Sequence, residues 1–259
     1  MKIRTVRHPG WSWWRRKEVT VFTPDIQLKK APVIFFCHGF GGTEWDGNYN
    51  TLIRWAVDCG YVVVYSPYQT IDDSVMERYE QLFEGFKAGV SRYGFLMDLT
   101  RVCYMGHSFG AGALPWIAQT GKARGWGSFA DTIFSMAPWY SYGVLTGTLN
   151  NRFLWDNTVF YGQCYKSDAS NSFKMMLDIF DNIEALTKAY TYVDEAQAEH
   201  DLPTERGDSV VRDKYILQPM KMILEDRASV NDWRHDFPVP LPPETQFRWK
   251  WVDPTNPRA

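Results

Sequence analysis

The sequence lacks a strong charge of either sign. Its 259 residues carry 28 Lys and Arg against 30 Asp and Glu, for a net charge of −2. No general attraction to nucleic acid or to an acidic membrane surface is therefore expected. Basic residues do gather near the start, around WSWWRRK. For this segment the sequence leaves two roles open, packing against a sheet edge and self-association, and it does not indicate an oligomeric state.

Cysteine is scarce, and the usual metal-binding spacings are missing. Neither CxxC nor HExxH occurs, so we expect no zinc site, no other metal and no cofactor. The cysteines are widely separated, which favours buried free thiols over a disulfide framework. They are Cys37, Cys59, Cys103 and Cys164.

Long apolar runs are also missing. No run approaches the length that spans a bilayer, and the first residues lack the apolar core of a secretory signal. We therefore expect no membrane span and a cytoplasmic location, although a removed signal peptide would leave the same sequence.

The composition that remains is typical of a globular domain. Hydrophobic residues make up 45% of the chain and charged residues 22%, which supplies a packed core and shows no signature of disorder. There is no internal repeat and no low-complexity linker before FPVPLPPE. We predict one domain over 1–259, with an N-terminal strand hairpin at about 1–24 and a Pro-rich tail at about 237–259.

Short runs that are almost unbroken in hydrophobicity predict strands buried on both faces. An opening pair of strands is predicted at 2–7 and 17–23, around a turn that contains HPG. The buried runs are PVIFFC (32–37), YVVVY (61–65), RVCYM (101–105), DTIFSM (131–136), TVFYG (158–162) and AYTYV (189–193).

Helical patterns lie between these strands. Ser74 and Glu77 have capping-box spacing ahead of an apolar stripe that runs to Val90. Further helices are predicted after Ser108, over 173–183, and over about 209–225, where Pro219 must kink or restart the helix. Alternating strands and helices predict an α/β fold, with a mostly parallel central sheet covered by helices on both faces.

The stretch Gly106-His107-Ser108-Phe109-Gly110 joins a predicted strand to a predicted helix. A strand that turns directly into a helix strains its central residue, and side chains two positions away on either side would collide with neighbouring backbone. Glycine removes that collision. The pattern predicts a nucleophilic Ser108, with a plain glycine-rich turn that carries an exposed serine as the alternative. A second glycine-rich motif, HGFGG at 38–42, follows the strand PVIFFC and can aim backbone N–H groups into the space above the serine.

With these motifs in this order, the sequence resembles the α/β-hydrolase family over roughly 32–200. In that family the oxyanion hole is built from the N–H after the nucleophile and an N–H from the loop after the third strand. The resemblance assigns those donors to Phe109 and Phe40. It also implies the chain order serine, acid, histidine, with the acid after the seventh strand and the histidine after the eighth.

Asp168 and His200 are the residues that fit this order, because each lies just past a predicted strand. Other candidates stay open at this point. His235 lies beside the Pro-rich tail and is the less favoured base. The rival acids are Asp178, inside a predicted helix, and Asp194 and Glu195, in the loop of the histidine itself.

The substrate pocket is predicted to be open and aromatic. Only about twenty residues, 137–157, fill the gap in which many relatives insert a helical lid, so we expect no large lid domain. The segment APW resembles the one after the sixth strand in cutinase-like hydrolases, where a Trp lines the acyl site. Trp139, Tyr140 and Trp45 are therefore candidate substrate contacts, with packing in the core as the alternative; for Trp45 a core or surface position is favoured.

These features predict a serine carboxylic-ester hydrolase with a Ser-His-Asp triad. The wider pattern is similar to cutinase-like and dienelactone-hydrolase-like esterases, although dienelactone hydrolases use cysteine where this chain has Ser108. The expected partner is a small-molecule or polymeric ester, with short or medium acyl chains or aromatic groups. The same triad would also suit an acyltransferase or a peptidase, and a hydrolase fold can serve as a non-catalytic binding protein.

Overall fold

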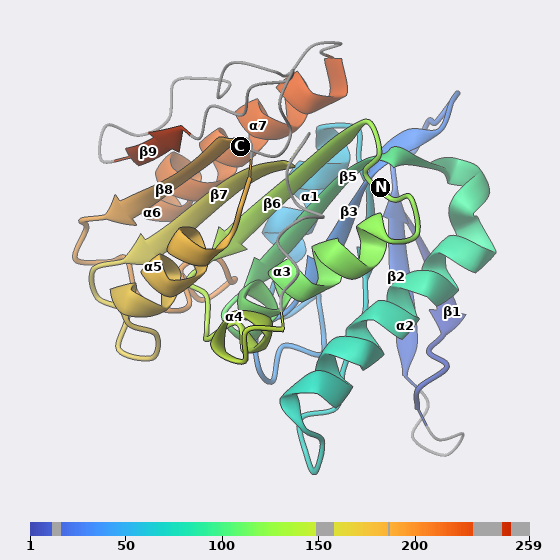
Figure 1. The fold of residues 1–259 in the computed structure, drawn as a ribbon. Helices are drawn as coiled ribbons and strands as arrows, with labels where there is room; N and C mark the ends of the chain where they lie inside the picture. Colours follow the sequence, from blue (N-terminus) through green and yellow to red (C-terminus); the bar gives the residue numbers. More distant parts are fainter. Residues whose placement is uncertain (12–16, 149–157, 186, 230–244, 250–259) are drawn as a thin grey trace, which may run out of the picture.

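The computed structural model describes residues 1–11, 17–148, 158–185, 187–229 and 245–249. In this part of the chain a single twisted sheet has the strand order β1-β2-β4-β3-β5-β6-β7-β8-β9 (Figure 1). Neighbours from β4 to β8 are parallel, whereas β1, β2 and β9 pair in antiparallel fashion. The strands are β1 (Lys2–Arg7), β2 (Glu18–Thr23), β3 (Ala31–Cys37), β4 (Val62–Tyr65), β5 (Met97–His107), β6 (Ala130–Met136), β7 (Thr158–Tyr165), β8 (Thr187–Val193) and β9 (Thr245–Trp249).

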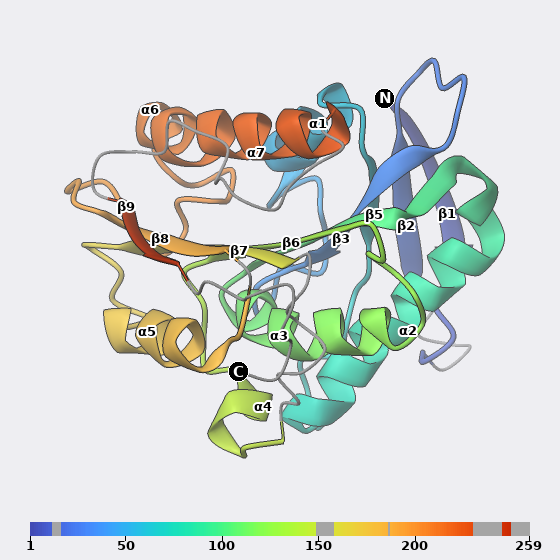
Figure 2. The ribbon, with the colours of Figure 1, turned by 45° about the horizontal axis from the view of Figure 1, so that its top comes forward.

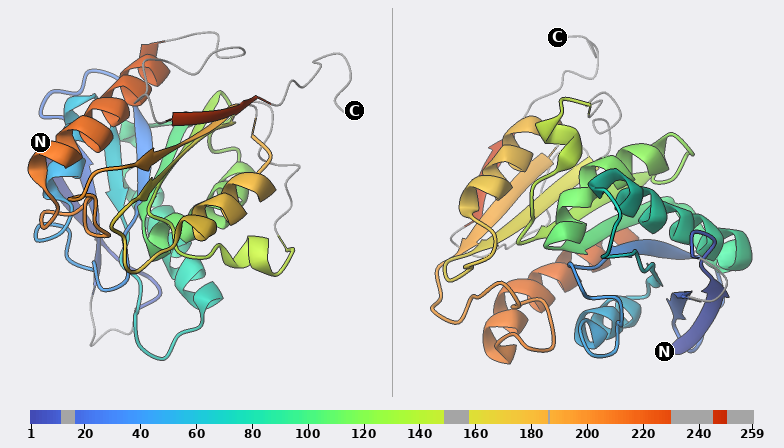
Figure 3. Two further views of the ribbon diagram at one scale, coloured as in Figure 1. Left: turned by 90° about the vertical axis from the view of Figure 1, so that its left-hand side faces the viewer. Right: turned by 90° about the horizontal axis from the view of Figure 1, so that it is seen from below.

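Helices cover both faces of the sheet (Figure 2). Helices α1 and α7 lie on one face, and α2, α3 and α5 lie on the other. The antiparallel edge strands β1 and β9 stand at opposite ends of the sheet (Figure 3). The helices are α1 (Asn50–Asp58), α2 (Val75–Tyr93), α3 (Phe109–Lys122), α4 (Tyr142–Leu145), α5 (Phe173–Asn182), α6 (Ser209–Arg212) and α7 (Gln218–Ser229).

The core has two layers because alternate residues of each strand face opposite ways. In β3, Val33 and Phe35 join the cluster under α2, α3 and α5, while Ile34 and Phe36 join the cluster under α1 and α7. All four side chains are at most 1% exposed. Burial on both faces explains why these strands read as unbroken apolar runs.

Most of the predicted elements are confirmed. The hairpin and the six buried strands form, and α2 begins with the predicted capping box between Ser74 and Glu77. All four cysteines are free thiols. Strand β5 begins four residues earlier than predicted: Met97 and Asp98 already pair with Ala31 and Pro32 of β3, ahead of an irregularity in register between Pro32 and Val33. The short helix α1 and the edge strand β9 were not predicted.

The restart predicted at Pro219 takes the form of a π-helical turn, Asp213–Leu217, between α6 and α7. A proline has no N–H to donate to the carbonyl four residues earlier, which here belongs to Tyr215. The Gln163 side chain of β7 donates to that carbonyl instead. The helix therefore stays anchored to the sheet where its own ladder is interrupted.

Some predictions fall outside the described residues. These are the roles proposed for the Trp-rich start (12–16) and for His235, together with most of the Pro-rich tail. In the described part of the chain, no helix combines the length and the apolarity that a bilayer crossing requires.

Candidate active site

Ser108 occupies a strained turn between β5 and α3. Its φ is +54°, a value that costs a non-glycine residue on the order of 1–3 kcal/mol. The flanking glycines permit the turn. A Cβ on Gly110 would lie 2.1 Å from the carbonyl oxygen of Cys37, and one on Gly106 would lie 2.8 Å from the backbone of Gly110. The sharp elbow predicted from sequence thus has a steric basis.

The end of β6 holds the elbow through backbone hydrogen bonds. The Ser108 N–H donates to the Met136 carbonyl at 3.0 Å, and the Ser108 carbonyl accepts from the Trp139 N–H at 2.9 Å. Between them, Ala137 also has a positive φ of 45°. These bonds over-determine the strained backbone of Ser108, which is the condition under which such strain persists.

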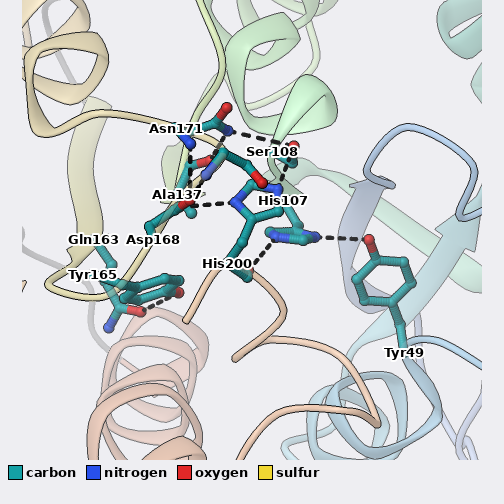
Figure 4. A network of polar contacts seen from close by, with 10 residues as sticks. Tyr49, His107, Ser108, Ala137, Gln163, Tyr165, Asp168, Asn171 and His200 are labelled. Atoms are coloured by element: carbon teal, nitrogen blue, oxygen red, sulfur yellow. Dashed lines mark hydrogen bonds and ion pairs between the residues drawn. The ribbon is translucent and has the colours of Figure 1, made fainter. Parts of the chain in front are cut away.

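Three side chains distant in sequence meet at the carboxyl ends of the strands (Figure 4). His200 Nε2 lies 2.9 Å from Ser108 Oγ, and His200 Nδ1 lies 2.8 Å from Asp168 Oδ2. The arrangement is consistent with the Ser108 hydroxyl donating to Nε2 while Nδ1–H donates to the carboxylate. The structure therefore brings together the three residues predicted as nucleophile, base and acid.

A tight turn after β7 orients the Asp168 carboxylate. Its Oδ1 accepts the backbone N–H groups of Ser170 and Asn171, each at 2.8 Å, which leaves Oδ2 for His200. The Asp168 side chain is 1% exposed, whereas that of His200 is 21% exposed. An ionised carboxylate that is so well buried needs these donors.

The rival acids have other partners. Asp178 pairs with Lys174 within α5, Asp194 pairs with Lys166, and Glu195 accepts from Lys214 and Tyr215. Each of these three carboxylates is thus paired with a lysine and not with His200.

The loop after β3 lies against the nucleophile. A Cβ on Gly39 would lie 3.3 Å from Ser108 Cβ, and the Gly42 N–H donates to the Gly39 carbonyl at 2.9 Å, which closes a turn around Phe40. Within the described residues, the N–H groups of Phe40 and Phe109 donate to no protein acceptor. Both N–H groups are therefore free to bind an oxygen of a substrate.

Aromatic side chains adjoin the elbow. The Trp139 ring stacks on Phe109 with centroids 5.8 Å apart, and Tyr140 meets Trp139 edge-on. The Trp45 ring instead packs edge-on against Phe22 of β2, which is a contact within the core cluster under α1. The structure thus brings Trp139 and Tyr140 to the elbow and packs Trp45 against the core, and a substrate contact by any of the three stays a prediction.

Three polar residues around the triad were not predicted. Asn171 donates to the Ala137 carbonyl at 2.8 Å and reaches Ser108 Oγ at 3.4 Å. His107 and Tyr49 form a buried chain of hydrogen bonds beneath His200 (Figure 4). The sequence gives little indication of these roles, because the contacts join segments that are far apart along the chain.

The segment predicted to replace a lid is described as far as Thr148. It forms the short helix α4 beside α3 and α5. Residues 149–157 lie outside the described part of the chain, so the openness of the site stays a prediction. Among the described residues, no group of three or more His, Cys, Asp or Glu side chains is placed to hold a metal ion.

Comparison with known proteins gives structural matches only. No protein-family model matches the chain, and no curated protein matches its sequence. A fungal esterase structure from Rhizomucor miehei superposes with a TM-score of 0.62 at 13% identity, covering 88% of this chain and 85% of that one. A variant of an esterase designated rPPE superposes with a TM-score of 0.60 at 16% identity, covering 88% and 83%. Together with the strand order, these likenesses show that the chain has the α/β-hydrolase fold.

Proposed function

We propose that this protein is a serine carboxylic-ester hydrolase that works through an acyl-enzyme. The observation that carries the proposal is the continuous line of hydrogen bonds from Ser108 Oγ through His200 to Asp168, with its two distances of 2.9 and 2.8 Å. A serine hydroxyl is a weak nucleophile near neutral pH, and this arrangement supplies the base that it requires.

The mechanism follows from the positions of the proton donors and acceptors. Ser108 Oγ attacks the ester carbonyl carbon while its proton passes to His200 Nε2, and the Asp168 carboxylate stabilises the imidazolium. The N–H groups of Phe40 and Phe109 bind the oxyanion, each donor contributing about 3 kcal/mol to the transition state. The C–O bond then breaks as His200 returns the proton to the departing alcohol. Water attacks the acyl-enzyme by the same steps and releases the acid.

Apolar side chains around the elbow favour an apolar acyl group. Phe40 is 60% exposed, and Trp139 and Tyr140 are half-buried on the side of α3. Such rings offer contact area to medium-chain or aromatic acyl groups, in a small molecule or at the surface of a polyester.

Replacing the nucleophile tests the proposal. We expect Ser108→Ala to lower turnover of p-nitrophenyl butyrate by about 10³-fold or more and to abolish labelling by a fluorophosphonate probe. Far-UV circular dichroism checks that the fold persists. Ser170→Ala is the matched control, because this exposed serine of the neighbouring loop contributes only its backbone N–H to Asp168.

Other outcomes identify the competing functions. A wild-type protein that neither labels nor turns over esters would contradict the proposal and favour a non-catalytic binding protein. Labelling at Ser108 with product formed mainly on an added amine or alcohol, in place of water, would favour an acyltransferase. Cleavage of peptide bonds in preference to esters would favour a peptidase.

A further inference from the structure

A buried chain of hydrogen bonds beneath the triad connects the loop after β3, the end of β5 and the loop after β8. The Gly39 N–H donates to the Tyr49 hydroxyl oxygen at 2.9 Å, and that hydroxyl lies 2.9 Å from His107 Nδ1. On the other side of the ring, His107 Nε2 lies 2.9 Å from the backbone carbonyl of His200. We name the Gly39-Tyr49-His107-His200 chain the relay.

One tautomer of His107 satisfies every bond in the relay. A carbonyl oxygen can only accept, so Nε2 must carry the proton that points at His200. Nδ1 is then an acceptor, and the Tyr49 hydroxyl donates to it while accepting from Gly39. The opposite tautomer would bring the Nε2 lone pair against the carbonyl oxygen.

The environment keeps His107 neutral. Its side chain is 2% exposed, and burial, aided by the neighbouring His200, lowers its pKa to about 3. The donor and the acceptor of each hydrogen bond in the relay therefore stay the same near neutral pH. This holds even in the step in which His200 carries a positive charge. Burial also raises the pKa of Tyr49, which keeps its hydroxyl proton in place.

The relay reaches both halves of the catalytic machinery. Gly39 directly precedes the oxyanion donor Phe40, and His107 directly precedes Ser108. At the far end, the carbonyl held by His107 belongs to the residue whose imidazole is the base. Gly39 and Tyr49 belong to the loop after β3, His107 is the last residue of β5, and His200 belongs to the loop after β8.

We propose, on the basis of the function proposed above, that Tyr49 and His107 are positioning residues. They fix the position of His200 relative to the loop that carries the Phe40 N–H. They act through the backbone of His200 and Gly39 and do not contact the substrate. Their loss is expected to weaken activation of Ser108, because small displacements of a general base reduce the rate strongly.

The rate of fluorophosphonate labelling of the full-length protein tests this role, because it reports nucleophile activation without depending on the natural substrate. We expect Tyr49→Phe to slow labelling about tenfold, with a matching fall in kcat on p-nitrophenyl butyrate and little change in KM. Tyr61→Phe is the matched control. It also removes a buried hydroxyl from the α1 side of the sheet, one that bonds to the Leu224 carbonyl in α7, and it should label at the wild-type rate.

Variants at His107 test whether the two residues act as one chain. His107→Leu should slow labelling at least as much as Tyr49→Phe, and the double variant should be no slower than His107→Leu alone. His107→Gln, which keeps an N–H donor of similar reach, should recover part of the rate. If His107→Leu fails to fold, the comparison of Tyr49→Phe with Tyr61→Phe decides alone.

A direct measurement of the tautomer is independent of catalysis. Long-range ¹H–¹⁵N correlation spectra should show neutral His107 with its proton on Nε2 from pH 7 to pH 5. The opposite tautomer, or wild-type labelling by Tyr49→Phe, would overturn the positioning role. Absence of labelling in the wild-type protein would instead count against the proposed hydrolase function, so the two failures are distinguishable.

Discussion

The Asn171 side chain contacts both the strained backbone beside the candidate site and the hydroxyl of Ser108. Its amide donates to the carbonyl of Ala137, a residue with positive φ, and also approaches Ser108 Oγ. Its backbone N–H meanwhile binds Asp168. One residue therefore connects the acid, the nucleophile and the strained end of β6.

Truncating this side chain should have two separable effects. We expect Asn171→Ala to lower the free energy of unfolding by about 1–3 kcal/mol, because the Ala137 carbonyl is left buried without its donor. We also expect a lower kcat, because the donor to Ser108 Oγ is lost. Urea unfolding and steady-state kinetics measure the two effects. Ser170→Ala should change neither, and an Asn171→Ala variant with full activity would exclude the catalytic contribution.

Among the elements, the elbow between β5 and α3 depends most on the absence of side chains. An added Cβ at Gly110 would lie 2.1–2.5 Å from backbone atoms of Cys37 and His38, which belong to the neighbouring strand and the loop after it. Backbone atoms of a central strand cannot move aside as the end of a flexible side chain can. The glycine is therefore a requirement of packing between α3 and β3.

We expect Gly110→Ala to destabilise the protein by about 3 kcal/mol or more, since the strand or the helix must shift to admit the methyl group. Gly94→Ala is the control. Gly94 has ordinary helical φ of −61°, and an added Cβ would meet only a Val90 methyl group at 3.6 Å. Thermal unfolding of both variants makes the comparison. Equal melting temperatures would contradict the steric explanation.

The strength of the local sequence signal explains which elements could be predicted. Buried parallel strands and the capped helix α2 have local signals, and so does the elbow, where strand, glycine, serine and helix are consecutive. Helix α1 has only nine residues, and it follows a loop rich in Gly. Strand β9 is a short edge strand next to prolines, so neither its length nor its flanks indicated a strand.

The residues of the candidate site also fall into a group that the sequence predicts and a group that it does not. Ser108 could be predicted from its local glycine motif, and Asp168 and His200 from the chain order that the resemblance to the α/β-hydrolase family implies. Tyr49, His107 and Asn171 could not, because their partners lie in distant segments of the chain: the His107 ring for Tyr49, the His200 carbonyl for His107 and the Ala137 carbonyl for Asn171. Such contacts depend on the distance between loops in the folded molecule, which a single sequence does not encode locally.

At the scale of the whole molecule, three buried histidines connect stability to pH. Burial lowers the pKa values of His8 and His38 from 6.5 to about 4, and that of His107 to about 3. In the unfolded chain all three return to about 6.5. Between pH 6.5 and about 4 the unfolded state therefore binds more protons than the folded state, and stability must fall as the pH is lowered through this range.

Each neutral histidine contributes a slope of up to about 1.4 kcal/mol per pH unit. We expect urea unfolding at pH 7, 6 and 5 to show a progressive loss of stability before carboxylates titrate. His8→Gln should reduce that slope by about a third, because His8 lies on the N-terminal hairpin and its bonds to Gln81 and Gly10 are independent of the triad. A free energy of unfolding that is flat from pH 6.5 to pH 5 would mean that these rings take up protons in the folded state. A protonated His107 would donate from both ring nitrogens, so its Nδ1 could no longer accept from the Tyr49 hydroxyl in the relay.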